Sequence, residues 1–558
     1  MPSPIFEFAD QFIDAEAALD PCGATERGIP GFDHLLTDYS PEGYEARAQQ
    51  HRNGLAELAA LPETNDDDRL AKGFITERFT TTLLGHDTGE WQRAVRAVAS
   101  PSSGLRSTFD LMPRNDATAW ENIAARLRAL PAALAGLRAT YEQGRVAGRV
   151  ASRRQVLAAA DQAATWADNR WFDSLAREAA ANAGLPPAVM AAVRDGAELA
   201  NAAYGEFAAY LRTEYSPAAT ETDGCGPERY TIGVRQMLGA DLDPDEMYDW
   251  AWTDFHHLRA EIAHTCERIL PGAGFAEVIK LLDNDPDRSV HGPDAYREWL
   301  QALTDNALAR SHAHFEIPDV MNRCEALIPP AGSAAAAYYT SPSEDFSRPG
   351  RTWYPTLGRT AFPMWGDVTT CYHESVPGHH LQLAYAMVQA GSLSRIQRNA
   401  FISGHGEGWA LYAERLCDEF GWFENPDHRL GFFAGQMLRS VRVIIDIGMH
   451  LGKRIPVGTT ASDGSAFHGG EVWNADLGYQ FAMSETGNTE AFMRSEIDRY
   501  LGWPAQAISY KIGEREWLTA RDEARARDGA GFDLRTWHTR ALRLGAIGLD
   551  QLRAELAR

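Results

Sequence analysis

A long stretch whose apolar residues recur every three or four positions most constrains the fold of this chain. Residues 118–220 are rich in Ala, Leu, Arg and Glu, and one part of them has the spacing of an amphipathic helix. The residues with this spacing are Ile123, Leu127, Leu130, Leu134 and Leu137. Pro131 lies among them and should kink or split the helix, because proline removes a backbone hydrogen bond. Residues 151–214 predict further helices, with a break near the turn at 184–187.

The length of 558 residues is sufficient for two or more domains. The turn-rich segment 221–227 is the best candidate boundary, so we expect a helical N-terminal lobe at 1–226 and a second helical lobe at 227–558. A single continuous domain is the alternative. Asp243 is followed by Pro and two acidic residues, which predicts a capped helix start. Residues 329–363 predict loops with a short sheet, so the expected fold is mainly α with a minor β element.

The composition favours a folded, water-soluble protein. Hydrophobic residues make up 44% of the chain, and the net charge of −24 repels nucleic acid and anionic membranes, so we expect neither as a partner. No run approaches the roughly 18 apolar residues of a membrane helix, and the N-terminus lacks the pattern of a signal peptide. The six cysteines are scattered, which indicates reduced thiols, a cytoplasmic location and no cysteine-based zinc site. The oligomeric state stays open.

Three histidines and one glutamate within eight residues form the most informative motif. Zinc peptidases commonly carry H-E-x-x-H on a helix, where two imidazoles share one face and the glutamate lies beside them. Here His373 and Glu374 begin such a motif, but Pro377 stands at the position of the second histidine. The next histidines are His379, six residues after the first, and His380, seven residues after it.

The turn and rise of an ideal helix limit which of these two histidines can lie beside His373. Six residues turn an ideal helix by about 600°, which puts His379 off the face of His373. Seven residues restore the face, but they rise about 10.5 Å, too far for zinc–nitrogen bonds of about 2.0–2.1 Å. A break at Pro377 and Gly378 would let His379 take the place of the second ligand. We therefore prefer His373 with His379, and keep His380 as the alternative.

A second motif supplies the third ligand that a catalytic zinc needs. Glu407 and Glu414 are seven residues apart, hence on one face of a predicted helix, and apolar residues 409–412 lie between them. We expect Glu407 to bind zinc and Glu414 to orient a ligand histidine. Two solvated surface carboxylates are the alternative.

These motifs resemble the bacterial domain of unknown function 885 family, whose pattern is H-E-x-x-P-G-H-H-x-Q followed by E-G-W-A-x-Y-x-E. Similar stretches at 347–350 and 499–513 extend the resemblance over most of the chain, although the family usually has P-G-Q-A where this chain has PAQA at 504–507. That family is distantly similar to zinc peptidases of the thimet oligopeptidase type. The resemblance implies a helical, clam-like body with a deep channel. It also implies a late tyrosine, here Tyr510, that stabilises the oxyanion, with a packed aromatic residue as the alternative.

Other residues are weaker candidates for the site or its support. His405 could line it, with helix capping as the alternative. Asp446 and His450, four residues apart on an apolar helix, could support the site or simply hydrogen-bond each other. Arg348 could bind a peptide carboxylate in a bidentate manner, with a structural salt bridge as the alternative.

The sequence thus predicts a zinc-dependent hydrolase, and in particular a peptidase acting on small peptides or amides. Zinc would be held by His373, His379 and Glu407, Glu374 would be the general base, and Tyr510 would stabilise the tetrahedral intermediate. Hydrolysis of an ester or a non-peptide amide at the same site is one alternative. A non-catalytic binding protein that retains the fold is another.

Overall fold

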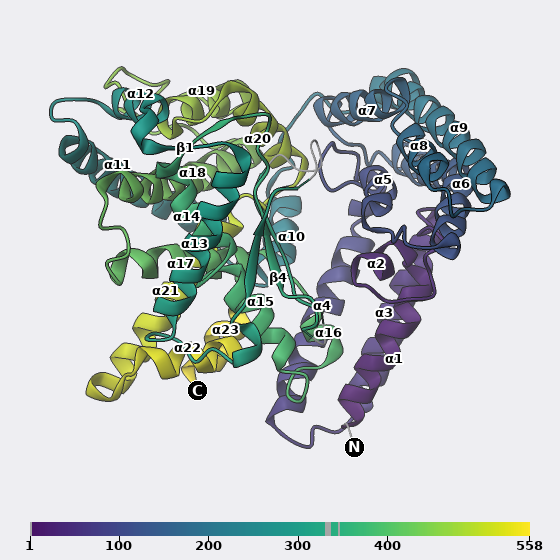
Figure 1. The fold of residues 1–558 in the computed structure, drawn as a ribbon, viewed down its shortest axis with the longest axis horizontal. Helices are drawn as coiled ribbons and strands as arrows, with labels where there is room; N and C mark the ends of the chain where they lie inside the picture. Colours follow the sequence, from purple (N-terminus) through teal and green to yellow (C-terminus); the bar gives the residue numbers. More distant parts are fainter. Residues whose placement is uncertain (1–2, 330–335, 344–345) are drawn as a thin grey trace. The chain divides into compact units, whose positions relative to one another are not determined.

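The structure, a computed structural model, describes residues 3–329, 336–343 and 346–558 and is mainly helical (Figure 1). The chain forms two compact units. The first comprises Met1–Cys225 and Asp498–Trp503, and the second comprises Gly226–Ile497 and Pro504–Arg558. The division predicted from the sequence placed residues 498–503 in the second lobe, whereas the structure groups them with the first unit.

The first unit is built from helices joined by short connections. Its α-helices are α1 (Pro4–Leu19), α2 (Pro21–Glu26), α3 (Pro41–Ala60), α4 (Asp66–Asp87), α5 (Pro101–Leu111), α6 (Ala117–Val146), α7 (Arg153–Asp168), α8 (Asp173–Ala181) and α9 (Pro187–Tyr210). Short helical turns lie at η1 (Glu90–Arg93), η2 (Leu211–Tyr215) and η3 (Ser216–Ala218).

Helix α6 confirms the periodicity seen in the sequence. All five of its spaced apolar residues are at most 3% exposed, and they pack into the core of the first unit. The expected split at Pro131 is wrong, because α6 runs through this proline as one helix. The buried leucines on both sides of Pro131 explain this: burying each stabilises the helix by about 1.5–3 kcal/mol, which offsets the loss of one backbone hydrogen bond.

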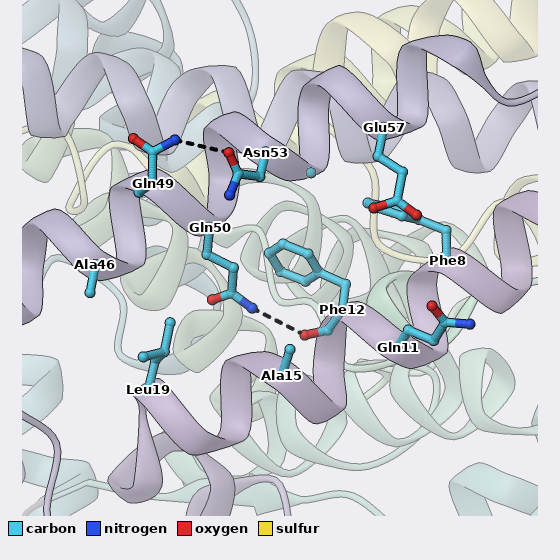
Figure 2. A pocket seen from close by; sticks show the side chains of 11 residues that line it. Phe8, Gln11, Phe12, Ala15, Leu19, Ala46, Gln49, Gln50, Asn53 and Glu57 are labelled. Carbon is cyan, nitrogen blue, oxygen red and sulfur yellow. Dashed lines mark hydrogen bonds between the residues drawn. The ribbon is translucent and has the colours of Figure 1, made fainter.

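A surface pocket of about 530 Å³ lies between α1 and α3 of the first unit. Figure 2 shows its lining, where Gln50 donates a hydrogen bond to the carbonyl oxygen of Phe12 and Gln49 donates one to Asn53. None of the site residues predicted from the sequence lines this pocket. The candidate chemistry therefore lies elsewhere, in the second unit.

The second unit holds the remaining helices and the strands. Its α-helices are α10 (Pro227–Leu238), α11 (Pro244–Ile269), α12 (Phe275–Asn284), α13 (Pro293–Ser311), α14 (Met364–Glu374), α15 (His379–Val388), α16 (Arg395–Arg398), α17 (Ser403–Glu419), α18 (Pro426–Leu451), α19 (Ala475–Thr486), α21 (Ser509–Asp528), α22 (Leu534–Arg543) and α23 (Leu549–Ala557). Helix α20 (Glu490–Gly502) begins in this unit and ends in the first. Short turns lie at η4 (Pro286–Arg288), η5 (Asp319–Met321) and η6 (Gly529–Gly531). Asp243 caps α11 as predicted, its side chain accepting from the amide of Asp245.

Two small sheets are formed by strands that lie before α14 in the sequence. Strand β4 (Gly350–Trp353) pairs in parallel with β2 (Cys324–Leu327) and antiparallel with β3 (Tyr338–Thr340). Strands β1 (Ser289–His291) and β5 (Ala361–Pro363) form an antiparallel pair, and β5 leads directly into α14. Part of the predicted loop and sheet region, at 330–335 and 344–345, lies outside the described residues.

Close helix packing brings distant parts of the second unit together. Helix α14 packs against α17 and α18, and α17 packs against α21. A Cβ atom on Gly513 of α21 would lie 2.2 Å from the carbonyl oxygen of Gly404, and one on Gly408 would lie 2.5 Å from Gly513 itself. Only glycine at these positions allows the two helix backbones to approach so closely. Among the helices that the structure describes, none is long and apolar enough to cross a membrane.

Candidate metal centre

The motif helix breaks between α14 and α15, where Pro377 and Gly378 lie. Helix α14 ends at Glu374, and the backbone then forms two hydrogen bonds that are wider than those of an α-helix. The amide of Gly378 donates to the carbonyl oxygen of Tyr372 at 3.0 Å, and the amide of His380 donates to that of Ser375 at 3.0 Å. Helix α15 then begins at His379. This break replaces the regular helix on which neither later histidine could join His373.

Gly378 is required for this local path. A Cβ atom at this position would lie 1.9 Å from the carbonyl oxygen of His373 and 2.4 Å from that of Tyr372. Both obstacles are backbone atoms, which cannot move aside as a flexible side chain could. Any larger residue would therefore push α15 away from the end of α14.

The break brings His373 and His379 together with Glu407 of α17. The two imidazole rings lie 4.9 Å apart between centroids and are nearly perpendicular, at 87°. The Oε2 atom of Glu407 lies 3.3 Å from Nε2 of His373 and 3.6 Å from Nε2 of His379. One ligand atom from each residue lies within 4.8 Å of the other two. Three side chains from three helices thus converge on one point.

The donor set and its spacing fit a zinc ion. Two ligands bound at about 2.0–2.1 Å in a tetrahedral arrangement lie roughly 3.3–3.4 Å apart, close to the observed carboxylate–imidazole separations. The Oε2 atom of Glu407 is buried and has no hydrogen-bond partner among the described residues, although it faces both histidines. A buried carboxylate oxygen without a partner is costly, and a cation at this point would satisfy it. Two imidazoles and one carboxylate suit zinc better than magnesium or calcium, which prefer oxygen ligands.

Glu414 fixes the orientation of the first histidine. Its Oε1 atom accepts a hydrogen bond of 2.7 Å from Nδ1 of His373, and its Oε2 atom accepts one from the hydroxyl of Thr369. This leaves Nε2 of His373 facing Glu407, as a metal ligand requires. Although burial lowers the pKa of His373, the neighbouring carboxylates of Glu407 and Glu414 raise it to about 10 in the metal-free protein. Burial works against the charge of Glu407 too, yet the two histidines hold the pKa of that carboxyl well below its usual range.

Glu374 and Tyr510 lie beside the three converging residues. Glu374 is the last residue of α14 and is buried, and this burial raises the pKa of its carboxyl group although His379 and His373 oppose the effect. Tyr510 lies in the first turn of α21, and its ring stacks near that of His373 with 6.3 Å between centroids. Helix α21, which carries this tyrosine, packs closely against α17, which carries Glu407.

Two residues near the centre escaped the sequence analysis. Thr369 lies four residues before His373 and so on the same helix face, a spacing that could have indicated its role. Arg439 of α18 lies with its guanidinium carbon 5.8 Å from the centroid of the Tyr510 ring, and its charge lowers the pKa of Glu374. No local pattern in the sequence links Arg439 to the motif helices.

His380 and His405 do not join the converging residues. The Nδ1 atom of His380 lies 2.9 Å from the hydroxyl of Tyr339 on β3, and its Nε2 atom lies 2.9 Å from the carbonyl oxygen of Met321. His380 therefore attaches α15 to the small sheet, and the structure does not favour it as the second ligand. His405 is buried against Trp517, with ring centroids 5.1 Å apart, and burial lowers its pKa to about 4.

Asp446 and His450 belong to a buried structural network. The Oδ2 atom of Asp446 accepts hydrogen bonds from the hydroxyl of Tyr230 at 2.7 Å and from the amide of Ala505 at 3.2 Å, and Nε2 of His450 lies 3.8 Å from Oδ1. The network anchors the segment that leads into α21 and Tyr510. Arg348 lies in the loop before β4, where its backbone amide donates to Ser343, and the structure does not bring it to the centre.

Comparisons with solved structures show the same fold in two bacterial proteins. A candidate lipoprotein from Colwellia psychrerythraea has a TM-score of 0.84 at 19% identity, with 99% of this chain and 98% of that chain covered. A candidate lipoprotein of unknown function from Shewanella oneidensis has a TM-score of 0.76 at 18% identity, with all of both chains covered. At these identities the likeness concerns the fold alone. A comparison with curated protein sequences found no match.

The sequence match to a family covers almost the whole chain. Residues 21–556 match the family described as "Bacterial protein of unknown function (DUF885)". This span includes the motif at the break between α14 and α15, both glutamates of α17 and the tyrosine of α21. The chain belongs to the DUF885 family of bacterial proteins.

Proposed function

We propose that this protein is a zinc-dependent hydrolase that cleaves amide bonds of small peptides. One observation carries the proposal: His373, His379 and Glu407 converge from three helices, and the buried Oε2 atom of Glu407 has no hydrogen-bond partner among the described residues. Zinc held by such a set acts as a Lewis acid and activates water for attack on a carbonyl group. We include in this proposal a distant resemblance to thimet oligopeptidase-type peptidases, which have a clam-like body and a deep channel.

Each residue around the centre has a role in the proposed hydrolysis. Glu374 adjoins the ligand His373, and its carboxylate would accept a proton from the attacking water and pass it to the leaving amine. Burial raises the pKa of Glu374, which makes its carboxylate a stronger proton acceptor. The phenol of Tyr510 would donate a hydrogen bond to the developing oxyanion, and Glu414 would hold His373 in its ligand orientation.

The metal and the base can be tested separately. Protein purified without chelators should contain about one zinc per chain, as a catalytic site with three protein ligands requires. Glu374→Gln should keep the zinc and lose about 10²–10⁴-fold in turnover, because an amide cannot accept the proton. Glu407→Gln, the matched control on the neighbouring helix, should lose zinc as well. Full activity of Glu374→Gln on the best substrate would exclude Glu374 as the base.

The bond that is cleaved can be decided by substrate panels. The same zinc chemistry serves peptides, other amides and esters, so matched peptide and ester substrates should be compared on one preparation. Faster cleavage of peptides would support the proposed peptidase, and zinc-loaded protein that cleaves neither would favour the binding protein. The cytoplasmic location stays a prediction, which cell fractionation can test against the lipoprotein descriptions of the two similar structures.

A further inference from the structure

Arg439 lies beside the proposed centre, where its charge lowers the pKa of Glu374. Helix α18 carries this arginine, which is only partly buried and can therefore be reached from solvent. Its guanidinium carbon lies 5.8 Å from the centroid of the Tyr510 ring, and that ring stacks 6.3 Å from the ring of His373. The arginine thus stands next to the tyrosine that we assign to the oxyanion.

The guanidinium group of Arg439 forms no ion pair within 4.0 Å with a carboxylate among the described residues, although its charge acts on Glu374. Its Nη1 atom donates to the carbonyl oxygen of Gly435, one turn back in the same helix, at 3.2 Å. Its Nε atom is buried and has no hydrogen-bond partner in the part of the chain that the structure describes. Arg442, one turn further along α18, instead pairs with Glu496 at 2.7 Å.

Arg439 differs in this respect from Arg429 and Arg442 on the same helix, which both pair with carboxylates. Acidic residues outnumber basic ones by 77 to 53, so most arginines can find a carboxylate nearby. A guanidinium group has five N–H donors in a planar fork that matches the two oxygens of a carboxylate. A buried donor without a partner is costly, unless a ligand supplies the acceptor. The missing acceptor next to Tyr510 is therefore best supplied by a carboxylate on the substrate.

We propose that Arg439 binds a carboxylate group of the substrate, so that the enzyme prefers anionic peptides. The inference rests on the proposed function, which it deepens by naming the substrate class. A C-terminal carboxylate and the side chain of an acidic residue present the same pair of oxygens. Arg439 is then a specificity-determining residue that fixes where the peptide lies relative to Glu374 and Tyr510.

Matched substrates separate this role from a structural one. One pair of peptides differs only in a free or amidated C-terminus, and a second pair differs only in a glutamate or glutamine side chain. Wild-type protein should prefer the acid member of one pair. Arg439→Gln should lower kcat/KM for that acid about 10- to 100-fold more than for the amide, the effect of one charge-assisted pair. Arg439→Lys should restore part of the preference, because it keeps the charge without the fork.

Arg429→Gln is the matched control on the same helix. Arg429 pairs with Asp418 at 3.0 Å, so its loss should leave the preference for the acid unchanged. An equal loss of kcat/KM on both members of a pair with Arg439→Gln would overturn the proposal, since Arg439 would then act on the fold or on Glu374. Wild-type protein without a preference in either pair would also overturn it.

Peptide binding keeps the test independent of turnover. The affinity of Glu374→Gln protein for both members of each pair can be measured by calorimetry, with and without the additional change Arg439→Gln. An acid preference that disappears with Arg439→Gln supports the recognition role, even if wild-type protein cleaves nothing and the proposed function fails. Equal affinity for acid and amide in both proteins overturns the recognition role.

Discussion

Zinc binding should displace a proton from His373. In the metal-free protein the carboxylates beside this buried histidine raise its pKa to about 10. A zinc ligand must be a neutral imidazole, so the proton on His373 competes with the metal at neutral pH. Because the pKa is raised, the competition is strongest at low pH and disappears as the pH rises through about 10.

The size of this competition follows from the pKa. At pH 7 the solution lies about three units below the pKa of His373, and each unit is worth about 1.4 kcal/mol, so protonation costs roughly 4 kcal/mol of zinc affinity. The apparent association constant should therefore rise about tenfold per pH unit between about pH 7 and pH 9. Removing the charge next to Nδ1 with Glu414→Gln should lower the pKa of His373 and weaken this dependence.

Calorimetry in buffers with different heats of ionisation measures the protons released. Titration of the metal-free protein at pH 7.5 should show release of about one proton from His373 for each zinc bound. A water molecule that ionises on binding could only add to this number. A zinc affinity that is constant from pH 7 to pH 9, with no buffer-dependent heat, would refute the assignment of His373 as a ligand protonated in the metal-free state.

Two further changes test the geometry of the site and of its support. His379→Ala should abolish tight zinc binding, which metal analysis can show. His380→Ala should leave zinc bound but lower the temperature of thermal unfolding, because it loosens α15 from Tyr339. Zinc loss from His380→Ala alone would contradict the assignment. Ala505 has a φ of 66°, which costs a non-glycine residue about 1–2 kcal/mol. Ala507 is a matched control, because both alanines are fully buried. The Ala505→Gly protein should have a free energy of unfolding about 1–2 kcal/mol higher than the Ala507→Gly protein. Equal free energies in denaturant titrations would contradict this.

Features of the helices could be predicted where neighbouring residues in the sequence determine them. The spacing of apolar residues in α6, the cap of α11 and the break after Glu374 all depend on residues within a turn or two of each other. Pro131 misled the prediction, because the packing of leucines from distant helices decides whether a proline interrupts α6. The inclusion of residues 498–503 in the first unit also follows from distant packing, as when Gln155 donates to the carbonyl oxygen of Asp498.

The residues of the candidate site show the same difference between local and distant causes. The pair His373 and His379 could be predicted from the expected break at Pro377 and Gly378, and Glu407 and Glu414 from their spacing of seven residues, which puts them on one helix face. The partners supplied by other helices could not be predicted in this way, and Arg439 is the clearest case.

Glycine explains how these separate motifs become one site. A Cβ atom would meet backbone at Gly378, where α15 begins, and at Gly513, where α21 crosses α17. The first contact sets the place of His379, and the second sets the distance between Glu407 and Tyr510. Side chains at either position would leave each motif intact and separate the groups by the width of a methyl group. Such a displacement is enough to impair chemistry that depends on a near-attack geometry. The geometry of the candidate site therefore depends on two glycines that would take no part in the proposed chemistry.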